Sequence, residues 1–142
     1  MTTLKDLALD IHVNAQEKGF WDHDRNMGEM LMLMTSELAE ALEEHRDGNP
    51  NVYYQCTNPS CEYFDKKLEK DFGKHVEYYG DRGPDGPICS GSLKPEGVAV
   101  ELADCLIRIL DTIQSLGVDV DEIVKIKMAY NATRAHKHGK AY

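Results

Sequence analysis

The chain has 142 residues and a formal net charge of −9, so its length corresponds to one ordinary domain that can bury a core of its own. The acidic balance excludes a nonspecific nucleic-acid binder, because phosphate backbones are bound by clusters of Lys and Arg. No apolar run approaches the roughly 18 residues of a membrane span, and the segment Met1–Lys18 is amphipathic and acidic, unlike a signal peptide. These features predict a cytoplasmic protein that binds neither nucleic acid nor membrane.

Two helices are predicted in the first third of the chain. Apolar residues at helical spacing over residues 4–15 predict the first helix, with Thr3 as its N-cap and Gly19 at its end. A second helical pattern starts at the N-cap Asn26 and stops near Gly48. Because the connection between them is short, we expect an antiparallel hairpin.

The following segment, residues 49–94, breaks the helical pattern and is interpreted as an insert. Residues 49–95 hold all five prolines and three of the four cysteines, and Gly80–Pro87 is rich in turn-forming residues. The sequence therefore predicts a small irregular module here.

Two more helices are predicted after the insert. Apolar residues over 102–116 predict a third helix that ends at Gly117, and Asp119 with Glu122 forms a capping-box start for a fourth. Residues 1–48 and 95–142 are therefore expected to form an all-α domain. Its two helical hairpins would build a structure like a four-helix bundle.

Four carboxylates border the apolar faces of the second and third helices. Glu37 and Glu40 are three positions apart, and so are Glu101 and Asp104, which places each pair on one helix flank. If the helices pack together, these acids converge and need protons or cations, and hard ions such as Mg²⁺ and Mn²⁺ prefer oxygen ligands. The alternatives are a solvated Glu-rich face, which a single Glu-x-x-Glu usually is, and a di-iron centre, which would need Glu-x-x-His motifs.

A polar stripe continues the apolar face of the fourth helix. It contains Lys127, Asn131 and Arg134. Lys and Arg are rarely buried without a partner, so this face should meet either carboxylates of other helices or an anionic ligand. A triphosphate bridged to metal would satisfy both the carboxylates and the cations, with Lys127 and Arg134 neutralising its charge. The alternative is simple ion pairing of these cations with neighbouring helices.

These motifs, taken in order, resemble those of MazG-type nucleotide pyrophosphohydrolases. The matching motifs are Glu37-x-x-Glu40, Glu101-x-x-Asp104, Lys127-x-x-x-Asn131-x-x-Arg134 and His138-Gly139-Lys140, and the segments Glu17–Trp21 and Lys94–Gly97 extend the likeness. The resemblance covers about residues 1–48 and 94–142. The insert departs from the family, where this connection is usually much shorter.

The resemblance implies an all-α MazG fold, assembly into homodimers or homotetramers, and Mg²⁺-dependent conversion of a (d)NTP to (d)NMP and pyrophosphate. Mn²⁺ could substitute for Mg²⁺. The implied metal ligands are Glu37, Glu40, Glu101 and Asp104, and the implied substrate-binding residues are Lys127, Asn131, Arg134 and Trp21. Glu40 is the candidate for orienting or deprotonating the attacking water, and Lys127 for stabilising charge on the reacting phosphorus. Trp21 could stack on a base, or it could pack in the core or within the hairpin.

The cysteines of the insert suggest a second metal site. Cys56 and Cys61 have permissible zinc-ligand spacing, Cys89 supplies a third thiolate, and His75 is a distant fourth candidate. Three alternatives stay open: structural zinc, a degenerate zinc-ribbon-like module without metal, and a disulfide. The competing function for the whole chain is a noncatalytic helical binding module that uses this insert as its partner surface.

Overall fold

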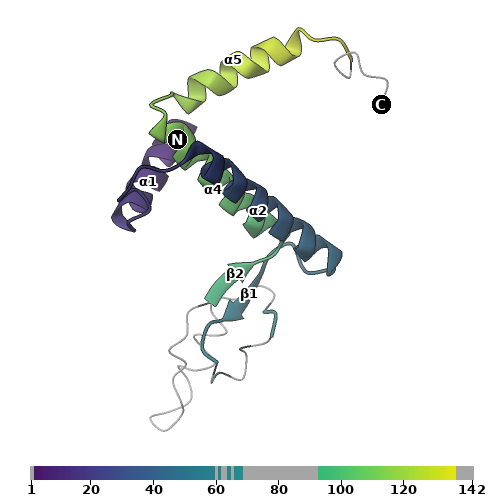
Figure 1. Cartoon of the computed structure of the whole chain (residues 1–142). Helices are drawn as coiled ribbons and strands as arrows, with labels where there is room; N and C mark the ends of the chain where they lie inside the picture. The colour runs from purple at the N-terminus through teal and green to yellow at the C-terminus, as the bar shows by residue number, and fades with distance from the viewer. Residues whose placement is uncertain (1, 60, 62–63, 65, 69–92, 137–142) are drawn as a thin grey trace. The chain divides into compact units, whose positions relative to one another are not determined.

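A computed structural model describes residues 2–59, 61, 64, 66–68 and 93–136 (Figure 1). This part of the chain contains four helices and one two-stranded sheet, in the order α1, α2, β1, β2, α4, α5. The predicted all-α class is confirmed only as a mainly-α fold, because these residues also contain a small sheet, and a MazG-type bundle stays a prediction. None of the helices in these residues is long and apolar enough to cross a membrane.

The chain divides into two compact units. The first unit comprises Met1–Met34 and Leu106–Tyr142, and the second comprises Thr35–Cys105. The boundary falls within α2 and again within α4.

The first two helices begin where their capping residues predict. α1 (Leu4–Glu17) starts with a capping box, in which the Thr3 hydroxyl accepts from the Asp6 N–H and the Asp6 carboxylate accepts from the Thr3 N–H. α2 (Met27–Arg46) follows Asn26, whose side-chain oxygen accepts from the N–H groups of Gly28 and Glu29. The predicted roles of Thr3 and Asn26 are confirmed.

The last two helices are α4 (Val98–Ser115) and α5 (Val120–Ala132). Asp119 caps α5 by accepting from the Glu122 N–H at 3.1 Å, as predicted. Its other carboxylate oxygen lies 2.8 Å from Nζ of Lys5, just inside α1. This contact and the buried apolar group of Ala8, Leu110 and Val120 join α1, α4 and α5 in the core of the first unit.

The second unit contains two short strands that the sequence did not predict. β1 (Tyr53–Cys56) pairs antiparallel with β2 (Leu93–Glu96), with Tyr53 opposite Glu96 and Cys56 opposite Leu93. Pro95 argued against a strand at this position, because proline has no N–H to donate to the ladder. Its partner Tyr54, however, exchanges both backbone hydrogen bonds with Leu68 on the opposite side, so Pro95 interrupts no bond of the ladder.

Gly97 lets the start of α4 approach the chain that follows α2. Its φ is +111°, and a Cβ built there would lie 2.5 Å from the Pro50 carbonyl oxygen and 2.7 Å from that of Asn51. The Ala99 N–H donates to the Asn51 carbonyl at 3.0 Å. Only glycine fits this backbone without strain, so Gly97 fixes where α4 begins.

Replacing Gly97 by alanine should destabilise the fold more than replacing Gly48. Gly48 also has a positive φ, of +66°, but a Cβ added at this residue would meet nothing within 4 Å, so Gly48→Ala should lose about 1 kcal/mol from backbone strain alone. Gly97→Ala adds a clash with two backbone oxygens and should lose at least twice as much. Urea unfolding of both variants measures this difference, and equal losses would contradict the close approach.

Candidate metal centre

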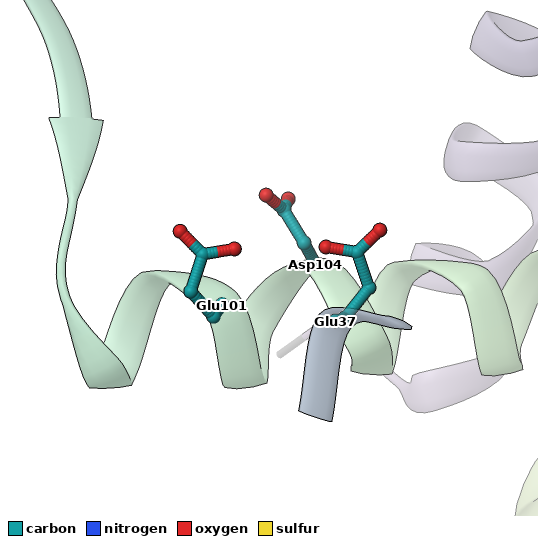
Figure 2. Close-up of side chains that lie close together, drawn as sticks. All are labelled: Glu37, Glu101 and Asp104. Carbon is teal, nitrogen blue, oxygen red and sulfur yellow. The ribbon is translucent and has the colours of Figure 1, made fainter. Parts of the chain in front are cut away.

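Three carboxylates of the second unit come together, and we call Glu37, Glu101 and Asp104 the acidic centre. Each offers one oxygen, and these oxygens all lie within 4.8 Å of one another. Glu37 comes from α2, whereas Glu101 and Asp104 come from neighbouring turns of α4 (Figure 2). Glu37 and Glu101 are 5% and 6% exposed, and Asp104 is open to solvent. The centre is therefore buried on one side and accessible on the other.

The buried glutamates of the acidic centre share a helix face with small buried side chains. Ala41 lies one helical turn after Glu37, and Cys105 lies one turn after Glu101; all four are buried. Residues four apart share a helix face, so each glutamate is on the inward side of its helix. This placement explains how carboxylates, which are almost never fully buried unless they are paired, become enclosed here.

Burial and like charges disfavour ionisation of Glu101. Its pKa is raised from 4.5 to about 7, chiefly because the carboxylate is removed from water. The negative charges of Glu40, Asp104, Glu96 and Glu37 raise the pKa further, in that order. A divalent cation at the centre would relieve this repulsion.

The acidic centre suits a hard cation such as Mg²⁺. With Mg–O bonds of about 2.1 Å, two oxygens on one ion can be at most about 4.2 Å apart. The oxygens of the acidic centre all lie within 4.8 Å of one another, which is close to this spacing. Three carboxylates at such separations form a donor set that fits a hard divalent ion.

Glu40 is the fourth metal ligand implied by the sequence, and it is placed differently from the other three. It is exposed on α2 and does not belong to the group whose oxygens lie within 4.8 Å. Its charge nevertheless raises the pKa of Glu101, so it acts on the same site. Ligation by Glu40 and its role toward water stay predictions.

A buried tyrosine joins the first strand to α2 beside the acidic centre. The Tyr53 hydroxyl donates to Glu44 at 3.3 Å, and the Asn49 side-chain amide donates to the same carboxylate at 2.9 Å. Tyr53 is 3% exposed, and burial, followed by the charge of Glu44, raises its pKa to about 12. Tyr53 is thus a neutral donor at physiological pH, and it holds β1 against the end of α2.

Lys94 and Glu96 lie in a segment that matches the family motifs, but the sequence predicted no role for either side chain. Lys94 Nζ lies 2.6 Å from Glu96 Oε1. Residues two apart on a strand point to the same side. Had β2 been predicted, this spacing would have indicated the pairing of Lys94 with Glu96. The hydrogen bond to Glu96 raises the pKa of Lys94, and the charges of Glu96, Glu101 and Glu40 add to this effect.

The predicted phosphate-binding residues belong to the other unit. Lys127 and Asn131 are exposed on α5, and Arg134 follows the end of that helix and is also exposed. Lys127 Nζ lies 5.1 Å from the centroid of the Tyr130 ring. Because the acidic centre is in the second unit, phosphate binding by these residues stays a prediction.

Trp21, the predicted base-stacking candidate, is anchored in the first unit by a buried carboxylate. Its indole N–H donates to both oxygens of Asp111, at 3.1 and 3.2 Å. His12 Nδ1 lies 2.6 Å from the same carboxylate, and its ring meets Trp21 edge to face at 5.0 Å. The roles of Asp111 and His12 were not predicted from the sequence. The signal that could have indicated Asp111 is an acidic residue on the core side of a predicted helix. Trp21 therefore contacts a residue of α4 as well as His12 of α1, and base stacking by Trp21 stays a prediction.

Only part of the predicted zinc set lies in the described residues. Cys56 is buried at the end of β1, and Cys61 is half-buried. His75 and Cys89 lie outside the described residues, as does the segment His138–Lys140. Zinc binding by the insert therefore stays a prediction.

The stability of the metal-free protein should fall as pH rises through the pKa of Glu101. Between pH 4.5 and 7 the folded protein binds a proton at Glu101 that the unfolded chain has lost. The stabilising contribution of the neutral carboxyl is therefore complete below pH 4.5 and disappears above pH 7, with an upper limit on the order of 3 kcal/mol.

Urea unfolding in EDTA at several pH values between 4.5 and 8 measures this contribution. Glu101→Gln should flatten the decline, because its amide does not titrate, whereas Glu43→Gln, on an exposed part of α2, should leave it unchanged. The same pH dependence in wild type and Glu101→Gln would contradict the assignment.

Comparison with known proteins adds no relative to this description. Neither protein-family models nor curated proteins nor solved structures match the chain. Function is therefore inferred from the acidic centre and from the sequence motifs.

Proposed function

We propose that this chain is a cytoplasmic, Mg²⁺-dependent nucleoside triphosphate pyrophosphohydrolase that converts a (d)NTP to (d)NMP and pyrophosphate. The observation that carries the proposal is the convergence of Glu37, Glu101 and Asp104 from two helices. The resemblance of the ordered motifs to those of MazG-type enzymes supports it and supplies the substrate class.

The acidic centre provides the ligands for the metal. Glu37, Glu101 and Asp104, joined by Glu40, would hold Mg²⁺ through carboxylate oxygens, which that ion prefers. When bound, the ion neutralises the acids and stabilises negative charge on the phosphate oxygens. Mn²⁺, which accepts the same ligands, would support the same reaction.

Residues of the chain itself bind the substrate and move the proton. Lys127, Asn131 and Arg134 bind phosphate oxygens, and the two cations offset the charge that develops during transfer. Glu40 orients the attacking water and accepts its proton. The water oxygen bonds to the α phosphorus while the bond from that phosphorus to the oxygen bridging the α and β phosphates breaks. The products are (d)NMP and pyrophosphate.

We also propose that the chain forms a homodimer or homotetramer. α5 leaves large apolar side chains exposed, including Ile123, Ile126, Met128 and Tyr130. Burial of such a face by a second copy would remove apolar surface from water.

The purified protein should hydrolyse a triphosphate to a monophosphate and pyrophosphate only when Mg²⁺ or Mn²⁺ is present. Glu101→Gln should reduce turnover at least about a hundredfold, because a neutral amide is a poorer ligand and leaves the ion less well held. Product analysis by anion-exchange chromatography over a panel of canonical and modified (d)NTPs measures this.

Glu43→Gln is the matched control, since it removes an exposed carboxylate from the same helix. Its turnover should equal that of wild type. Release of inorganic phosphate alone, or full activity of Glu101→Gln, would refute the proposed reaction. Binding without turnover that is lost on replacing Cys56 and Cys61 would instead favour the noncatalytic binding module.

Light scattering after size exclusion should give a mass two or four times the 16.0 kDa of one chain. Ile126→Glu places a charge on the exposed face of α5 and should shift the population toward monomer, because an unpaired charge is costly to bury. Lys125→Glu, on the same helix, is the control for added charge. A wild-type monomer at micromolar concentration would contradict the assembly.

A further inference from the structure

Lys94 lies on the strand that leads directly into the helix of the acidic centre. β2 ends at Glu96, and α4 begins after Gly97. Figure 2 shows the strand entering α4 on the side of Glu101, away from Asp104. Only Gly97 separates the strand of Lys94 from the helix that carries Glu101 and Asp104.

The Lys94 ammonium is held at one side and open to solvent at the other. Its Nζ lies 2.6 Å from Glu96 Oε1; the Glu96 side chain is 14% exposed and that of Lys94 is 64% exposed. A lysine ammonium has three N–H donors. Glu96 takes one of them, and the exposure of the side chain leaves the ammonium accessible to a ligand.

Lys94 and Glu96 share the electrostatic environment of the acidic centre. Glu96 is among the charges that raise the pKa of Glu101, and Glu101 with Glu40 is among those that raise the pKa of Lys94. All these residues belong to the second unit. Lys94 is thus a solvent-facing cation on the strand that precedes the helix of Glu101 and Asp104.

We propose that Lys94 is a substrate-positioning residue whose ammonium binds a nonbridging phosphate oxygen of the nucleotide at the acidic centre, while Glu96 holds that ammonium in place. This inference rests on the proposed function and adds to it a phosphate-binding residue outside α5. The polyanionic substrate approaches a site of negative charge, and a cation at its edge offsets the repulsion.

The proposal predicts opposite effects on metal and on phosphate. Without substrate, the positive charge of Lys94 repels an incoming cation, so removing it should tighten divalent-ion binding. With metal bound, the same removal should weaken pyrophosphate binding, because a charge-assisted hydrogen bond is lost. A merely structural role for Lys94 would weaken both.

Lys94→Met, Lys94→Arg and the control Lys125→Met test this role. Calorimetry should show Mn²⁺ alone binding several-fold more tightly to Lys94→Met than to wild type. Pyrophosphate with saturating Mg²⁺ should bind about tenfold more weakly, which corresponds to about 1.4 kcal/mol, and KM for the triphosphate should rise more than kcat falls. Lys94→Arg keeps the charge and should stay near wild type in Mn²⁺ affinity, and Lys125→Met should match wild type throughout.

Lys94→Met binding Mn²⁺ and pyrophosphate as wild type does would overturn the proposal, as would weaker binding of both. If Lys94→Met does not fold, Lys94→Gln takes its place with the same expected shifts, and wild-type binding of Mn²⁺ and pyrophosphate in Lys94→Gln overturns the proposal. If Lys94→Met has wild-type turnover and an unaltered KM, the proposed role of Lys94 is refuted, whereas the proposed reaction stands. Opposed shifts in binding without turnover of any triphosphate refute the proposed reaction but leave Lys94 as a polyphosphate ligand.

Discussion

Repulsion among carboxylates held out of water is the constraint on which the second unit depends. Glu37 and Glu101 are nearly inaccessible to solvent, with Asp104 beside them. Carboxylates this close are stable only when protons or cations compensate their charge. Without metal, burial and then the neighbouring negative charges raise the pKa of Glu101 to about 7. A divalent ion at the centre would remove the part of this effect that comes from repulsion.

Backbone contacts around the two short strands hold these acids in place. Gly97 allows α4 to begin against the carbonyls of the chain after α2, and Tyr53 joins β1 to Glu44 near the end of α2. The contact at Gly97 acts between segments that are far apart in sequence, whereas Tyr53 and Glu44 are nine residues apart. The side-chain positions at the acidic centre therefore depend on a support that contains no metal ligand of its own.

Local chemistry made much of the helical structure predictable. Thr3, Asn26 and Asp119 cap helices because each side chain reaches an N–H two or three residues away, and the spacing of Glu101 and Asp104 is likewise local. The strands, the ion pair of Lys94 with Glu96 and the contacts of Asp111 were not predicted. They depend on the partner across a ladder or on another helix, and Pro95 obscured the strand that would have indicated Lys94.

The antiparallel register of β1 and β2 has a consequence for variation in chain length. The ladder places Cys56 opposite Leu93, so the chain leaves the two strands and returns to them at one pair of neighbouring residues. Doubling the length of a flexible connection adds only about 0.6 kcal/mol of closure entropy. Natural insertions or deletions beyond Cys56 could therefore accumulate, or a foreign sequence be grafted there, while the paired strands keep both helices in place.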